Sequence, residues 1–355
     1  MYILLPLIFY TPVCYVNKEV IDKKKAAHSK KHHRNHMYRK MACNRQQVFI
    51  GISLPNQRDE HWVRDRQAME VYAADKGART AVEFADNDAA KQEKQVEDLI
   101  SKGINVLIIA PVDSSSTKTI VEKAHKAGIK VIAYDRLINN SDVDLYVSYN
   151  NLRIGELQAR YLINAAPRGN YILLSGDPKD NNSRLFKEGA MEYLRPLVLN
   201  RDIKIVTDKE VENWDPNIAY NIVLNSLKEN NNNISAILAP NDKLAGAAID
   251  ALKTQGLAGK VPVTGLDAEL EAVRRVVQGL QLMTIFKDTR ELARAAVEAA
   301  IKLARGQPID VNGEVNNGKA DIPSILFSTS VVTADNVVEV LIDSGYLKES
   351  DVFNT

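Results

Sequence analysis

Short β-branched runs alternate with amphipathic helical stretches along most of this 355-residue chain, roughly every 25 to 30 residues. The first cycles predict strands at 48–54, 78–84, 104–111 and 129–135, and helices at 61–76, 89–102 and 116–127. Each of these helices is followed by a glycine (Gly77, Gly103 and Gly128), the residue that most often ends a helix. Strand–helix cycles of this kind predict a parallel sheet covered by helices.

A second series of the same kind begins near Leu152. Its strands are predicted at 171–177, 203–211, 235–242, 261–267, 282–288 and 325–333, with a helix over 291–303 between the last two. These runs are apolar nearly throughout, as expected when helices cover both faces of a sheet. The chain is also long enough for two domains of roughly 150 residues each. The sequence therefore predicts an α/β protein with two doubly wound parallel sheets.

Charge is distributed unevenly along the chain. The whole sequence has 46 basic and 45 acidic side chains, but residues 17–45 hold ten of the basic and two of the acidic ones. Residues 46–355 therefore carry 36 basic and 43 acidic side chains, a net charge of −7. Because a negative net charge opposes binding to phosphate backbones, we expect no nucleic acid partner for this part of the chain.

Residues 1–45 are predicted to be a leader or membrane anchor followed by a basic linker. Met1–Val16 is uncharged and apolar, shorter than the ~20 residues that span a bilayer and closer to the apolar part of a signal peptide. The basic cluster follows this run instead of preceding it, and Pro6 and Pro12 interrupt it. An irregular leader, or a true start at Met37 or Met41, therefore stays open beside the expectation of an extracytoplasmic protein.

Neither the cysteines nor the histidines predict a metal site. Cys14 and Cys43 are the only cysteines, so residues 46–355 have no disulfide or Cys-ligated metal available to them. Four histidines, at positions 28, 32, 33 and 36, have metal-like spacing but lie among lysines without acidic ligands between them. A solvated basic linker is the interpretation we prefer. We expect no metal and no cofactor.

Polar side chains follow the predicted strands, at the edge where α/β sheets bind their ligands. They are Asp135, Arg136, Asp180, Asn182, Asn241, Asp267 and Lys287. The two tryptophans of the chain, Trp62 and Trp214, also follow predicted strands. Each polar residue alone is more simply a helix cap or a turn former. Together, aromatic faces and planar polar groups favour a monosaccharide site, because rings stack on sugar C–H faces while the polar groups bind the hydroxyls.

Several local motifs resemble the D-xylose branch of the periplasmic sugar-binding protein family. They are AYDRLI (133–138), SGDPKDNN (175–182), APNDKLAG (239–246), TGLDAEL (264–270) and IFKD (285–288). The resemblance runs from about Val48 to Glu349 almost without gaps. It implies two lobes of the type I periplasmic binding protein fold, joined by three crossover strands and closing on one sugar, for delivery to an ABC permease. The lobes would comprise 46–153 plus about 288–327, and 154–287 plus about 328–355.

The resemblance also assigns roles to individual residues. Trp62 and Trp214 would be the rings that sandwich the sugar, and the seven polar residues above would bind its hydroxyls. His61 would bind the sugar with them, although the family pattern has an arginine before the tryptophan. The alternative is that His61 faces solvent at the start of the helix. Leu266 stands where the pattern has a glutamine before Asp267. These two positions leave open which pentose or hexose is bound, with D-xylose preferred.

Three other functions stay open at this stage. The closest is a xylose sensor that signals to a membrane histidine kinase. A transcription regulator of the lactose-repressor type has the same body fold but needs an N-terminal helix-turn-helix of about 50 residues, and residues 17–45 lack apolar periodicity. A glycosidase would need a carboxyl group with a raised pKa, whereas these acids lie beside Arg136, Lys287 and amides. We therefore expect a binding protein that is not an enzyme.

Overall fold

A computed structural model describes residues 47–353 of the chain. The predicted leader or anchor, the basic linker, both cysteines and the four clustered histidines lie outside the described residues. From Val48 onward the chain forms one compact unit. No helix in residues 47–353 has the length and apolar character needed to cross a bilayer.

The first lobe is built on a sheet of seven strands in the order β10-β11-β5-β4-β3-β1-β2. The strands are β1 (Phe49–Leu54), β2 (Arg79–Phe84), β3 (Val106–Ile109), β4 (Lys130–Tyr134), β5 (Leu145–Tyr149), β10 (Gly313–Asn316) and β11 (Asp321–Phe327). All neighbours are parallel except β10, which is antiparallel to β11. The covering helices are α2 (Glu60–Asp75), α3 (Ala89–Ser101), α4 (Lys118–Lys126) and α10 (Thr289–Ala304).

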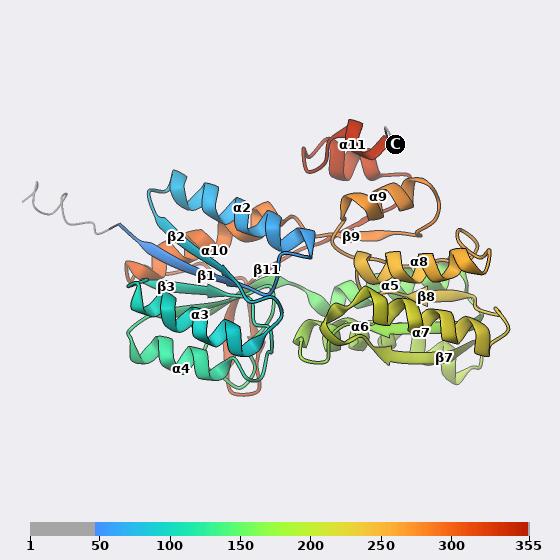
Figure 1. The fold of residues 1–355 in the computed structure, drawn as a ribbon, viewed down its shortest axis with the longest axis horizontal. Coiled ribbons are helices and arrows are strands. Elements are labelled where there is room, and N and C mark those ends of the chain that lie inside the picture. The colour runs from blue at the N-terminus through green and yellow to red at the C-terminus, as the bar shows by residue number, and fades with distance from the viewer. Residues whose placement is uncertain (1–46, 354–355) are drawn as a thin grey trace, which may run out of the picture. The chain divides into compact units, whose positions relative to one another are not determined.

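Alternate side chains of these strands enter two different cores. Val106 and Ile108 of β3 pack in the cluster that includes Met69 of α2 and Ala296 of α10. Leu107 of the same strand packs in the cluster formed with α3 and α4. The helices therefore cover both faces of the sheet, α2 and α10 on one and α3 and α4 on the other (Figure 1).

The second lobe is built on a smaller parallel sheet in the order β7-β6-β8. Its strands are β6 (Gly169–Ser175), β7 (Ile203–Glu210) and β8 (Ala236–Leu238), and an antiparallel pair, β9 (Thr284–Phe286) and β12 (Ser330–Val332), lies beyond them. Its helices are α5 (Asn151–Ala165), α6 (Asn181–Leu199), α7 (Pro216–Glu229), α8 (Asp242–Thr254) and α9 (Leu270–Val277). Three short helices also belong to this lobe: η1 (Glu212–Trp214), η2 (Val338–Ile342) and α11 (Glu349–Phe353).

The fold class predicted from the sequence is confirmed, and the chain passes three times between the two sheets. The passages follow β5, β9 and β11. The three glycines predicted to end the first helices have positive φ angles of 70° to 81°. The exact boundaries of the lobes stay a prediction.

Two strand predictions were wrong or incomplete, and two strands were missed. The segment 261–267 makes only one bridge, Val263 to Ile237, because Pro262 has no N–H for a ladder and Gly265 approaches a polar side chain. The run 325–333 is two strands that belong to different sheets, with the chain crossing at 328–329. Strands β5 and β10 were not predicted at all.

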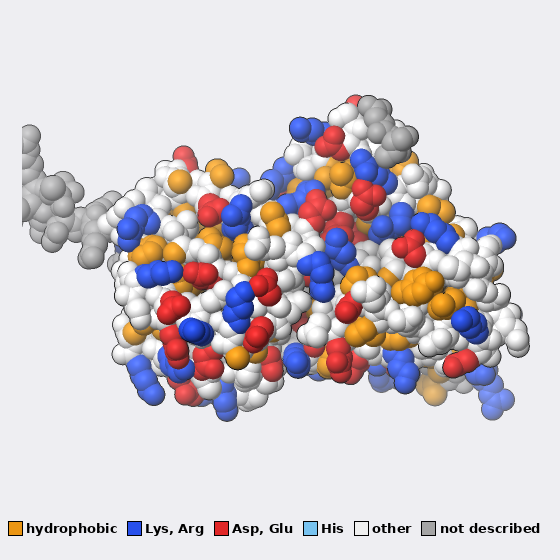
Figure 2. Space-filling view, viewed as in Figure 1, with side chains coloured by type: hydrophobic (Ala, Val, Ile, Leu, Met, Phe, Trp, Pro, Cys, Tyr) orange, Lys and Arg blue, Asp and Glu red, His pale blue; other side chains and the backbone are white. Residues whose placement is uncertain are grey.

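Lysines, arginines and acidic side chains are interspersed on the face drawn in Figure 2, and no large area of that face is basic only. This distribution is in keeping with the net charge of −7 counted for residues 46–355.

Helices α5 and α6 touch through two glycines, each facing the backbone of the other helix. A Cβ atom added to Gly155 would lie 1.8 Å from the carbonyl oxygen of Phe186. A Cβ atom added to Gly189 would lie 2.0 Å from the carbonyl oxygen of Leu152. Only glycine permits this approach, which sets the position of α6 and thus of the polar residues at its start.

We predict that Gly155→Ala lowers the free energy of unfolding by about 3 kcal/mol, because the two helix backbones must separate to admit the methyl group. Gly246→Ala in α8 is the matched control, since its added Cβ would meet no backbone and only the end of the Arg275 side chain, at 3.2 Å. That variant should change stability by less than about 1 kcal/mol. Urea unfolding measures both, and equal losses would contradict the account.

Candidate functional site

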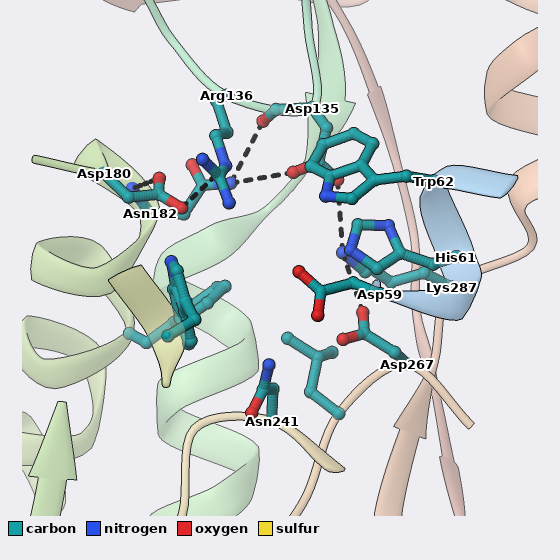
Figure 3. A pocket seen from close by; sticks show the side chains of 13 residues that line it. Asp59, His61, Trp62, Asp135, Arg136, Asp180, Asn182, Asn241, Asp267 and Lys287 are labelled. Atoms are coloured by element: carbon teal, nitrogen blue, oxygen red, sulfur yellow. Dashed lines mark hydrogen bonds and ion pairs between the residues drawn. The ribbon is translucent and has the colours of Figure 1, made fainter. Parts of the chain in front are cut away.

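One cavity with an empty volume of about 360 Å³ lies between the strand ends of the two lobes (Figure 3). The structure brings all ten residues proposed from the sequence to its wall. They are His61, Trp62, Asp135, Arg136, Asp180, Asn182, Trp214, Asn241, Asp267 and Lys287. Asp59, Phe186 and Leu266 complete the lining. That these residues bind a ligand stays a prediction.

Each strand end supplies one part of the wall, as the rule for α/β sheets requires. The turn after β1 and the start of α2 provide three lining residues, and the turn after β4 provides two. In the second lobe, the lining comes from the start of α6, from η1 after β7, and from the ends of β8, β9 and the segment 261–267. Asp180 and Asn241 are also helix N-caps, accepting the backbone N–H groups of Asn182 and Leu244.

The ammonium group of Lys287 lies between two carboxylates, one from each lobe. Its Nζ is 3.1 Å from Asp135 Oδ2 and 3.1 Å from Asp267 Oδ1, and its side chain is only 7% exposed. Burial alone would lower the pKa of Lys287, but the two carboxylates raise it above its usual value. Burial would raise the pKa of Asp135, but Lys287 brings it below its usual value. Lys287 and Asp135 are therefore both charged at ordinary pH.

Two further contacts join the lobes directly across the cavity. Arg136 Nε lies 2.8 Å from Asp180 Oδ2, and Asn182 Nδ2 donates to both the carbonyl and the Oδ1 of Asp135, each at 3.1 Å. Asn151 fixes the Asn182 amide by donating to its oxygen at 2.8 Å. Burial raises the pKa of Asp180 although Arg136 opposes the shift. These contacts hold α6 against the end of β4.

His61 is buried beside the first tryptophan, so the alternative in which it faces solvent was wrong. Its side chain is 12% exposed, and its Nδ1 lies 3.5 Å from Asp65 Oδ2. The ring lies 4.2 Å from the ring of Trp62, tilted by 43°. Burial would lower the pKa of His61, but Asp267 and Asp65 raise it. The protonated imidazole, which has two donors, therefore persists to a higher pH than for a free histidine.

Three polar atoms of the cavity residues are buried without a hydrogen-bond partner in the described part of the chain. They are Nε1 of Trp62, Nε1 of Trp214 and Oδ1 of Asp267. The last is close to Lys287 Nζ, but the angle does not make a hydrogen bond. An unpaired buried polar atom costs about 1 to 3 kcal/mol, so these atoms favour a polar guest.

Three residues of the cavity wall have left-handed backbone. Asp135, Trp214 and Asp267 have φ angles of 58°, 52° and 99°. Residues other than glycine adopt such φ angles rarely, at a cost on the order of 1 to 3 kcal/mol each. Strain of this kind gathers at binding and active sites, and here it aims three polar or aromatic side chains at one space.

The sequence analysis missed two lining residues, Asp59 and Phe186. Asp59 lies on the turn after β1, three positions before Trp62, so its place at a strand end was a usable signal. Burial would raise its pKa, but Arg58 and His61 lower it, which leaves a carboxylate. Phe186 lies one helical turn after Asn182 on α6, and helix periodicity would have placed it on the same face.

Comparison with known proteins assigns the chain to a family. A sequence model described as a periplasmic binding protein domain matches residues 50–308. The chain belongs to the periplasmic binding protein family. It is 41% identical over 305 residues to the D-xylose-binding periplasmic protein of Haemophilus influenzae, covering 86% of this chain and 92% of the relative.

Two further relatives match this chain over most of their own length. The D-xylose-binding periplasmic protein of Escherichia coli is 40% identical over 312 residues, and the match covers 88% of this chain and 94% of the Escherichia coli protein. The crystal structure of a carbohydrate transporter solute-binding protein from Chloroflexus aurantiacus in complex with D-glucose has a TM-score of 0.80 at 36% identity. That match covers 86% of this chain and 98% of the other. The resemblance stated from the sequence is thus confirmed.

Next to the cavity, Glu269 is buried at the start of α9 among mostly negative neighbours. Burial, with the negative charge of Asp267, raises its pKa to about 7 even though Lys243 Nζ lies 3.3 Å from its Oε2. The folded protein therefore holds a proton on Glu269 at pH values where the unfolded chain has released it. Stability derived from this proton is lost as the pH rises from about 4.5 to about 7.

We predict that Glu269→Gln gains stability relative to the parent protein as the pH rises from 5 to 8, because glutamine does not titrate. The gain should be on the order of 2 to 3 kcal/mol across that range. Urea unfolding at four pH values measures it, with Glu271→Gln, at an exposed position on the same helix, as the control. If the free energies of unfolding of the parent and Glu269→Gln changed equally with pH, the raised pKa of Glu269 would be contradicted.

Proposed function

We propose that this chain is an extracytoplasmic binding protein that closes its two lobes on one monosaccharide, D-xylose in the first place. The observation that carries the proposal is the cavity itself, which places two tryptophans and a set of fixed polar groups around one buried space. The D-xylose named for two relatives at 40 to 41% identity supports the choice of sugar. The D-glucose bound by the Chloroflexus aurantiacus protein makes D-glucose the first competitor.

The chemistry of the cavity suits a neutral polyhydroxyl ligand. Each sugar hydroxyl donates one hydrogen bond and accepts others, and the wall offers both kinds of partner. Within the described residues the indole N–H groups of Trp62 and Trp214 have no acceptor, and Asp267 Oδ1, which is ion-paired with Lys287 but accepts no hydrogen bond, can accept one from a ligand hydroxyl. The carboxylates of Asp135 and Asp180 are already paired with Lys287 and Arg136, so a ligand need not bring a positive charge to neutralise them. Sugar C–H faces can lie against the indole rings.

The same contacts argue against catalysis. Acid catalysis of glycoside hydrolysis needs a carboxyl group with a raised pKa and an oxygen free to give its proton. Asp180 has a raised pKa, contrary to our expectation from the sequence, but its oxygens accept from Arg136 and from the N–H of Asn182. Asp135 is held at both oxygens by Asn182 and Lys287. We therefore propose a binding role and no enzymatic one.

The partner that receives the sugar is, in this proposal, the membrane part of an ABC permease. A sensor role with a membrane histidine kinase is the alternative, and sugar uptake by cells lacking this chain separates the two. Loss of uptake supports delivery, while intact uptake with loss of sugar-dependent expression supports sensing.

Calorimetric titration and thermal melting of the full chain with D-xylose, L-arabinose, D-ribose and D-glucose test the proposed ligand. A sugar at 100 times its Kd should add about 2.7 kcal/mol to stability. We expect D-xylose to bind with the lowest Kd. A lower Kd for D-glucose would change the named sugar, and no binding by any of the four would overturn the proposal.

In the same titrations, Asp267→Ala should cost about 2 to 4 kcal/mol of binding free energy, because it removes a charged acceptor and leaves its donors unpaired. Asp75→Ala is the control, since that side chain is 71% exposed on α2 and faces no part of the cavity. It should bind with the parent affinity. Equal losses for the two variants would mean that the sugar does not use this cavity.

A further inference from the structure

Arg58 reaches across the mouth of the cavity from the turn between β1 and α2. Its Nη2 donates to the carbonyl oxygen of Asn213 at 2.9 Å and lies 3.4 Å from that of Trp214. Both acceptors belong to η1 of the second lobe, whereas Arg58 belongs to the first. The side chain is 40% exposed, so it lies over the opening and is not part of either core.

The other end of the guanidinium is fixed on its own lobe. Arg58 Nε donates to Asp59 Oδ1 at 3.2 Å, and Asp59 Oδ2 accepts from Asn56 Nδ2 at 3.0 Å. The Asn56 side chain also accepts from the Asp59 N–H and donates to Asn87 Oδ1. This chain of hydrogen bonds gives the guanidinium a set direction before the lobes meet, so less side-chain entropy is lost on closing.

Trp214 needs such a fixed neighbour because its backbone is strained. Asn213 and Trp214 are consecutive residues with φ angles of 55° and 52°. The indole ring lies directly against Gly176, where an added Cβ atom would be 2.1 Å from the ring. Within its own lobe the turn is held by Asp177, which accepts the Asn213 N–H at 2.8 Å, and by the carbonyl of Val211, which accepts the Trp214 N–H at 3.1 Å. The position of this ring is therefore set from both lobes.

We propose that Arg58 is a positioning residue that holds Trp214 against the bound sugar when the lobes are closed, and so slows release of the sugar. The inference rests on the proposed function and adds a residue that does not line the cavity. Because Arg58 meets its acceptors only when the lobes are together, its removal raises the rate constant for sugar dissociation. The association rate constant is unaffected, since the sugar first meets separated lobes, in which Arg58 does not contact η1.

Stopped-flow fluorescence tests this role with D-xylose and the full chain, since the only two tryptophans both line the cavity. Arg58→Ala should release D-xylose about tenfold faster, as expected for loss of a hydrogen bond from a charged donor. Its association rate constant should change by less than about twofold. Arg58→Lys should be intermediate, because one ammonium group cannot hold Asp59 and the η1 carbonyls in the same fixed geometry.

The control is Arg168→Ala, which removes an arginine that is 81% exposed and paired with Asp202 at 3.1 Å, far from the strand ends that line the cavity. It should release sugar at the parent rate. The sugar-free melting temperature of Arg58→Ala should match the parent, and acrylamide should quench its sugar-bound emission more strongly. Unchanged quenching with faster release would mean that Arg58 acts only through Asp59 and would overturn the positioning role.

The outcomes separate the two proposals. A parent protein that binds D-xylose while Arg58→Ala releases it at the same rate would overturn only the role of Arg58. Full restoration by Arg58→Lys would also overturn it, in favour of charge alone. If neither protein binds any sugar of the panel, the proposed function fails and the role of Arg58 fails with it.

Discussion

The ammonium group of Lys287 is the contact on which the candidate site depends. It lies on the segment after β9 and pairs at 3.1 Å with a carboxylate on each side, Asp135 after β4 and Asp267 at the end of the segment 261–267. Three buried charges are stable only together, because removing one partner leaves an uncompensated charge and costs several kcal/mol. The triad thus fixes three strand ends relative to one another, and the remaining lining residues are placed around it.

The contacts across the cavity are made by the protein alone. Arg136 pairs with Asp180, Asn182 donates to Asp135, and Arg58 spans the opening. Each contact is of modest strength because it replaces hydrogen bonds to water. Together they show which groups of the second lobe must contact the first lobe when the cavity closes. A ligand that adds its own bonds to both walls shifts the balance further toward the closed arrangement.

Much of the site was predictable from the sequence because its residues follow strands. Asp135 and Lys287 were found by this rule without any knowledge of their distance. The segment 261–267 was predicted as a strand because its apolar composition is that of a strand, although Pro262 lacks the N–H that a ladder needs and Gly265 lies against a buried polar side chain. Asp59 was missed although it follows a strand, as the other lining residues do. Arg58 was missed for a different reason: its contact with the second lobe depends on how the lobes meet, which periodicity does not encode.

The central claim is that one sugar joins two lobes that close around it. The most direct measurement is the radius of gyration of the full chain by small-angle X-ray scattering, with and without saturating D-xylose. The account predicts a smaller radius of gyration with the sugar. An unchanged radius together with calorimetric proof of binding would contradict closure and place the sugar outside the cavity described here.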